Sequence, residues 1–164
     1  MKLKISIILS AVFLLFSCQR DETETQTIDQ VLKLYIKNSA GQDLLNPKIK
    51  GSYTSASLLD LLGVKDSIAI SGYSLLKDSD TVTYLDYPAG AIRLKDSLSS
   101  DDVQTYYSQF AIKLVKTATD SDTDLIKIEY KSTPSLFQIS KLWYNGELKF
   151  TKIPGQPNIV RIVK

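Results

Sequence analysis

Few types of side chain in this chain of 164 residues could carry chemistry, and those types restrict what that chemistry is. The chain has no histidine, which excludes Ser-His and Cys-His catalysis and every metal site that contains histidine. The single cysteine, Cys18, excludes an intrachain disulfide and a thiolate zinc cage. What remains is the chemistry of carboxylates, hydroxyls, lysines and aromatic rings.

The sharpest polar feature is the alternation of Asp120, Asp122 and Asp124. Carboxylates in a loop can offer several oxygens to Ca²⁺, which takes six to eight oxygen ligands. The run resembles the opening of an EF-hand loop, although Leu125 stands where that loop has glycine and Lys131 where it has a bidentate glutamate. The three aspartates are therefore a candidate calcium site. The alternative is a solvated hairpin loop built from turn-forming aspartates.

An enzyme without histidine would need a pair of carboxylates or a Ser-Lys dyad. The acidic side chains mostly fall in loops or on alternating solvent faces, as Glu129 and Glu147 do. Paired carboxylates for glycoside hydrolysis need a cleft, and a small domain offers little room for one. Serines and lysines are so abundant that spacing selects no pair. We therefore expect a protein that is not an enzyme and that uses no cofactor.

The segment that precedes Cys18 has the character of a targeting signal. Lys2 and Lys4 are followed by an apolar run over residues 5–16, which only Ser6 and Ser10 interrupt. A basic start and about a dozen apolar residues are typical of a secretory signal peptide, and the run is too short for a membrane-spanning helix. The sequence therefore predicts an exported protein with a signal peptide over residues 1–17.

Residues 15–18, Leu-Phe-Ser-Cys, resemble the lipobox of bacterial lipoproteins. Phe16 departs from the smaller residue that is usual at its position. The resemblance implies cleavage after Ser17 and acylation of Cys18, which becomes the mature N-terminus and the membrane anchor. Several acyl chains hold a protein durably at a membrane, whereas one does so only marginally. The alternative is an ordinary secretory signal with an incidental cysteine.

The four residues after the cysteine, Gln19, Arg20, Asp21 and Glu22, resemble the surface-export signal of Bacteroidota lipoproteins. In that signal, glutamine and a basic residue precede acidic ones. The resemblance implies an outer-membrane lipoprotein that is exposed at the cell surface. The alternative is a merely solvated linker, with the protein on the periplasmic side.

The domain organisation follows from this reading of the N-terminus. Residues 18–29 are polar apart from Cys18 and Ile28, so we expect a flexible tether there and one folded domain over residues 30–164. Removal of residues 1–17 leaves 18 basic and 18 acidic side chains, a formal charge of zero. The chain has no basic block, so nucleic acid is not an expected partner.

Period-2 alternation dominates residues 30–164, as in the expected strands over residues 31–37 and 125–131. Asn145-Gly146 is the preferred pair for a two-residue type I′ hairpin. Further strands are expected over residues 48–53, 67–71, 81–87, 91–94, 110–115, 139–144, 147–152 and 159–163. Helical turns are indicated only at residues 57–62 and 99–107. The pattern predicts an all-β fold, an antiparallel β-sandwich of immunoglobulin-like or related type.

The aromatic side chains are the candidates for ligand contact. A sugar-stacking platform could draw on six of them: Tyr84, Tyr87, Tyr106, Tyr107, Trp143 and Tyr144. Aromatic residues are also good strand formers, so packing within the sheets is the alternative. Adjacent residues of a strand point to opposite faces, so we expect one of Trp143 and Tyr144 to lie in the core.

Residues 38–47 and 143–148 loosely resemble the small β-sandwich lipoproteins that Bacteroidota encode in large numbers. That resemblance supports the fold and transfers no functional residue. We expect a lipid-anchored, non-catalytic surface binding or accessory module with an exposed aromatic or apolar patch. Its partners would be the membrane, through Cys18, and an envelope protein or glycan. The alternative is an assembly protein that acts through protein contacts, which predicts a long open sheet edge.

Overall fold

The computed structural model describes residues 25–164 apart from residues 66, 98 and 101, and every helix or strand within that part of the chain is a β-strand. There are twelve: β1 (Thr27–Asp29), β2 (Leu32–Lys37), β3 (Ser55–Asp60), β4 (Ile68–Ala69), β5 (Ser74–Lys77), β6 (Thr83–Tyr87), β7 (Leu94–Lys95), β8 (Gln104–Val115), β9 (Ser121–Ser132), β10 (Leu136–Tyr144), β11 (Glu147–Thr151) and β12 (Asn158–Val163).

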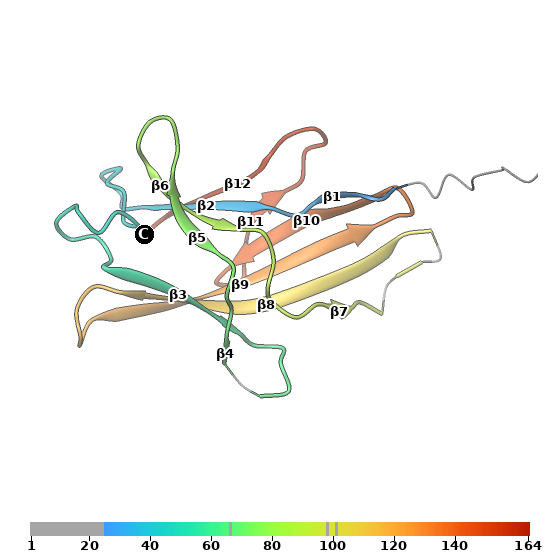
Figure 1. Cartoon of the computed structure of the whole chain (residues 1–164), viewed down its shortest axis with the longest axis horizontal. Helices are drawn as coiled ribbons and strands as arrows, with labels where there is room; N and C mark the ends of the chain where they lie inside the picture. The colour runs from blue at the N-terminus through green and yellow to red at the C-terminus, as the bar shows by residue number, and fades with distance from the viewer. Residues whose placement is uncertain (1–24, 66, 98, 101) are drawn as a thin grey trace, which may run out of the picture.

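Three long antiparallel strands, β8, β9 and β10, form the centre of an eight-stranded sheet, which we call the large sheet (Figure 1). Strands β8 and β9 pair along their full length, from Gln104 opposite Ser132 to Val115 opposite Ser121. β3 and β7 pair with the edge of β8 that faces away from β9, and β4 pairs in turn with β3. β1 and β11 pair with the outer edge of β10. The large sheet therefore presents one broad outer face over β8–β10.

A second sheet of four strands, the small sheet, has the order β12-β2-β6-β5 and lies against the large one (Figure 1). The expected all-β sandwich is confirmed. Two of its strand pairs are parallel, however: β12 with β2, and β1 with β10. The chain leaves the large sheet after Asp29 and enters the small sheet at Leu32, so its first two strands belong to different sheets.

The core lies between the inner faces of the two sheets. Leu32, Leu34 and Ile36 of β2 are fully buried, as the alternation predicts. The rings of Tyr87 on the small sheet and Phe110 on the large sheet meet across the core, with centroids 4.9 Å apart. Burial of apolar surface between two sheets is the main favourable term in the stability of such a domain.

Several local expectations are wrong. Residues 57–62 are not a helical turn, because Ser55–Asp60 pairs residue by residue with β8 as strand β3. Residues 48–53 form turns and bends instead of a strand. The folded region begins earlier than residue 30, because Thr27–Asp29 pairs with β10.

The hairpin that joins β10 to β11 is confirmed. Asn145 and Gly146 both have positive φ, 50° and 81°, as a type I′ turn requires. The turn brings Tyr144 opposite Glu147 and Trp143 opposite Leu148. Through this pairing, Leu148 lies on the same outward face of the large sheet as Trp143.

Candidate functional site

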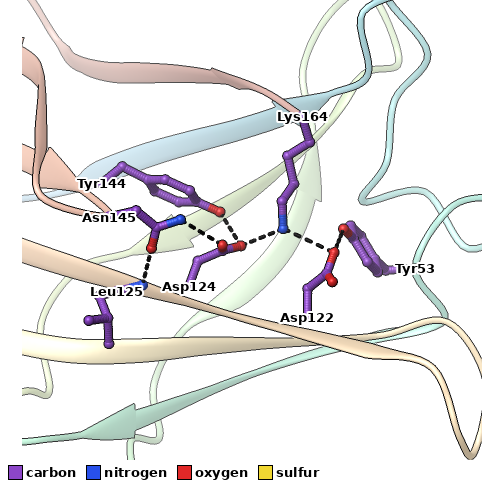
Figure 2. Close-up of polar contacts among 7 residues, drawn as sticks. All are labelled: Tyr53, Asp122, Asp124, Leu125, Tyr144, Asn145 and Lys164. Atoms are coloured by element: carbon purple, nitrogen blue, oxygen red, sulfur yellow. Dashed lines mark hydrogen bonds and ion pairs between the residues drawn. The ribbon is translucent and has the colours of Figure 1, made fainter.

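The aspartates that suggested calcium lie mainly on a strand, because β9 already starts at Ser121. Asp122 and Asp124 point to the inner side of the large sheet, opposite Leu114 and Ile112 of β8. Between their carboxylates lies the ammonium of Lys164, 3.1 Å from Asp122 Oδ2 and 2.5 Å from Asp124 Oδ2 (Figure 2).

Hydroxyl and amide donors complete this cluster. Tyr144 Oη donates to Asp124 Oδ2 at 2.6 Å, and Asn145 Nδ2 donates to Asp124 Oδ1 at 2.8 Å. The hydroxyl of Tyr53 donates to Asp122 (Figure 2). Burial alone would raise the pKa of Asp124, but the hydrogen bonds from Lys164, Tyr144 and Asn145 outweigh it and hold the pKa below its usual value.

The cluster therefore carries its own cation. Asp120 lies apart from it, in the turn between β8 and β9, where its carbonyl accepts from the N–H groups of Lys116 and Thr117. Within the described part of the chain, no group of three or more histidine, cysteine, aspartate or glutamate side chains is placed to hold a metal ion. The solvated-loop interpretation holds for Asp120, which lies in the turn, and is wrong for Asp122 and Asp124, which are strand residues bound to Lys164.

The anchor and export residues, Cys18, Gln19, Arg20, Asp21 and Glu22, lie outside the described residues. The part of the chain that the structure describes contains no helix that is long and apolar enough to cross a membrane.

The outer face of the large sheet holds the other candidate site. Trp143 and Tyr144 do point to opposite sides: Tyr144 is buried in the core, whereas Trp143 lies on the outer face opposite Lys127 of β9 and Leu148 of β11. A hollow of about 430 Å³ lies beside the indole ring. This volume falls in the range of about 300–1,000 Å³ that is usual for small-molecule pockets.

The hollow combines apolar and polar groups. Its lining includes Gln109 of β8, Leu125 and Lys127 of β9, Trp143 of β10 and Gly146 of the hairpin. Register places Gln109, Lys127 and Trp143 in one row across three strands. This row exists because β8, β9 and β10 pair directly, although the three residues are far apart in the sequence.

Lysine ammoniums lie close to the aromatic rings of this face. Lys127 Nζ is 5.3 Å from the ring centroid of Tyr107 and 5.5 Å from that of Trp143. Lys141 Nζ is 5.9 Å from the Trp143 centroid. At such distances an ammonium is attracted by the ring quadrupole. We call Tyr107, Lys127, Lys141 and Trp143, together with the hollow, the Trp143 site.

The structure separates the six aromatic candidates. Tyr87 and Tyr144 belong to the core, and Tyr106 packs against it. Tyr84 lies on the small sheet beneath Lys33, whose Nζ is 5.0 Å from its ring centroid. Of the six, only Tyr107 and Trp143 come together on the outer face of the large sheet.

Comparisons with known proteins assign no family to the site or the fold: no family model, no curated protein and no solved structure matches this chain. The case for a function therefore rests on the geometry of the Trp143 site.

Sequence reasoning missed Gln109, Lys127 and Lys141 as members of a site. The alternation Ile126-Lys127-Ile128 does assign Lys127 to the solvent face. Its position opposite Trp143 depends on strand register, which includes an irregularity between Ile139 and Lys141. A β-bulge of this kind redirects side chains and is not visible in the hydrophobic pattern.

Proposed function

We propose that this protein is a non-catalytic binding module, held at the outer membrane by a lipid on Cys18 and exposed at the cell surface, with the Trp143 site as its ligand site. The observation that carries the proposal is the hollow beside Trp143 on an outward sheet face. Leu125 and Leu148 add exposed apolar surface to that face, 45% and 49% of each residue being accessible. Such a patch with a few polar groups is typical of a recognition surface.

The position of the site relative to the tether supports this role. The side chain of Gln26 donates hydrogen bonds to Ser132 Oγ and to the Thr133 carbonyl. The residue that precedes β1 therefore lies next to the end of β9. Lys127 lies five residues away along that strand, about 17 Å at the rise of an extended chain. Gln26 and the Trp143 site are therefore separated along the sheet.

An assembly role through strand pairing has less support. It predicts a long open edge, whereas the outer strands of the small sheet, β5 and β12, have four and six residues. Short edge strands are a usual protection against pairing with other chains.

Fluorescence of the one tryptophan in the sequence tests the proposal, because its signal comes from the site itself. The purified lipoprotein in phosphatidylcholine nanodiscs is titrated with glycan and peptide libraries. A true ligand is expected to shift the Trp143 emission and to protect the indole from acrylamide quenching.

The variant Lys33→Gln is the matched control, because it removes an ammonium that lies over a ring on the other sheet. It should respond to ligand like the wild type, whereas Leu125→Asp, at the edge of the hollow, should not. If no library component changes the emission of the wild type, the Trp143 site is not a ligand site and the proposal fails.

A further inference from the structure

Two positive charges flank the indole ring of the Trp143 site. Lys127 and Lys141 hold their ammoniums 5.5 and 5.9 Å from the centroid of Trp143. A sugar ring that stacks its C–H face on the indole would take the place of an ammonium over the ring, and the flexible lysine side chains could then pair with an acid group at the rim of the sugar. We propose that the ligand is an acidic saccharide, stacked on Trp143 and paired with Lys127 and Lys141. This inference rests on the binding function proposed above.

The charge of the outer face is complementary to such a ligand. On β8, β9 and β10, the outward lysines are Lys113, Lys127, Lys131 and Lys141, and the outward carboxylate is Glu129. Residues 18–164 have equal numbers of basic and acidic side chains, so this surplus is local to the face. A local positive surplus raises the concentration of anions near the site.

Glu129 forms an ion pair with one of the two lysines, Lys141, and with no other lysine of the site. Its carboxylate accepts a hydrogen bond of 2.6 Å from Ser140 Oγ and lies 3.9 Å from Lys141 Nζ. In the described part of the chain, no carboxylate lies within 4.0 Å of Lys127 Nζ. Lys127 is exposed and its partners are two rings, so an anionic group can engage its ammonium without breaking an ion pair.

The lining also suits the neutral parts of a sugar. The amide of Gln109 offers a donor and an acceptor for hydroxyl groups, and Leu125 extends the apolar surface. An acidic lipid bilayer is the competing anionic surface. A face that binds such a bilayer inserts projecting apolar side chains into it. Leu125 and Leu148 are exposed on this face, but Trp143, the ring at the centre of the site, is half-buried and flanks a hollow. The recessed ring favours the saccharide.

Oligogalacturonate and its fully methyl-esterified form are a matched pair of probes, because esterification removes the charge and keeps the sugar ring. Heparin-derived oligosaccharides supply sulfate in place of carboxylate, and phosphatidylglycerol vesicles supply an acidic lipid surface. Binding to the lipoprotein in nanodiscs is measured by Trp143 fluorescence and by calorimetry. We expect at least one acidic oligosaccharide to bind at least tenfold more tightly than its neutral counterpart, with affinity that falls as salt rises.

Lys127→Gln and Lys141→Gln should each weaken that binding several-fold, Trp143→Ala should abolish it in calorimetry, and Lys33→Gln should leave it unchanged.

Equal affinity for charged and neutral oligosaccharides, lost in Trp143→Ala, would overturn the inference and leave the binding function standing. Binding to the vesicles alone would also overturn it. If none of the acidic saccharides binds while another library component shifts the Trp143 emission, the acidic ligand is wrong; if nothing does, the binding function fails as well.

Discussion

At the scale of single residues, Lys164 connects the chain that follows β12 to two carboxylates of β9. Asp124 depends on it most, because 9% of its side chain is exposed against 45% for Asp122. Exposed ion pairs contribute about 0–1 kcal/mol. Removing a donor from a buried carboxylate lowers the free energy of unfolding by more, because the buried carboxylate cannot regain its hydration.

Lys164→Met keeps the length of the side chain and removes its charge. We expect the free energy of unfolding to fall by about 1–3 kcal/mol, since Asp124 loses a charged donor in a buried place. Urea unfolding of residues 25–164, followed by Trp143 fluorescence, measures the loss. Lys149→Met is the control: its partner Glu147 is 72% exposed, so a change of at most about 0.5 kcal/mol is expected.

The pH dependence provides a second readout of the same variant. The pKa of Asp124 is lower in the folded state, so its stabilisation is complete above about pH 4 and is lost as the pH falls through the lowered pKa. The pKa of Lys164 is raised, because hydrogen bonds to Asp124, Tyr53 and Asp122 outweigh its burial. Its stabilisation is therefore complete below about pH 10 and is lost above the raised pKa. Lys164→Met should weaken both dependences; an unchanged pH profile would contradict this account of the cluster.

At the scale of elements, polar contacts hold both ends of β12, the strand that runs parallel to β2. Lys164 holds one end. At the other, Asn158 Nδ2 donates to Asp29 Oδ1 at 2.8 Å, and Lys152 Nζ lies 2.6 Å from Asp29 Oδ2 and 2.9 Å from Asn158 Oδ1. A parallel pair has no hairpin to set its register. We infer that these two polar clusters help to set it.

Two connections between strands contain a glycine, and the reason why a side chain is disfavoured differs between them. Gly146 has φ +81°, and a Cβ there would meet nothing within 4 Å. Gly90, between β6 and β7, has φ +135°, and a Cβ there would lie 2.5 Å from Ile70 Cγ2 and 3.1 Å from the Ser71 carbonyl oxygen. Both positions disfavour a side chain through backbone conformation, but only Gly90 also does so through close packing.

Gly146→Ala should therefore lower the free energy of unfolding by about 1–2 kcal/mol, the cost of a left-handed backbone. Gly90→Ala should cost about 1–3 kcal/mol more, because the methyl group overpacks the contact with Ile70. Urea unfolding of both variants measures the difference, and Gly146→Ala is the matched control for backbone strain. Equal losses would show that the close approach at Gly90 has no energetic weight.

At the scale of the whole molecule, the lipid anchor proposed at Cys18 can be tested separately from the Trp143 site. Cys18→Ala should leave an unprocessed precursor that takes up no fatty-acid label, because the thiol that would be acylated is gone. Metabolic labelling with a fatty-acid probe and the mobility of the protein on a gel check this result. Label on the variant would mean that the lipobox assignment is wrong.

Protease treatment of intact cells then separates the two orientations of the wild-type protein. A head domain at the cell surface should be degraded, whereas a periplasmic one should be spared until the outer membrane is opened. A periplasmic protein of known location serves as the control for membrane integrity. Protection of the head in intact cells would favour the periplasmic alternative and would restrict the ligand to periplasmic components.

Part of the fold and of the site could be predicted because it depends on local chemistry. The alternation of Leu32, Leu34 and Ile36 predicts a half-buried strand, and Asn145-Gly146 predicts the hairpin, since each pattern acts over a few residues. The opposite directions of Trp143 and Tyr144 follow from the pleat alone. The local pattern of residues 57–62 does not predict a strand, because pairing with β8 decides the conformation of that segment.

The sequence by itself determined the all-β class, the formal charge of zero over residues 18–164 and the absence of histidine chemistry. Only the tertiary structure decided that Lys164 lies between Asp122 and Asp124, and that Gln109, Lys127 and Trp143 form one row. The physical reason is that these contacts join residues from separate strands. Register and burial across sheets set them, and neither quantity is contained in a local pattern of residue types.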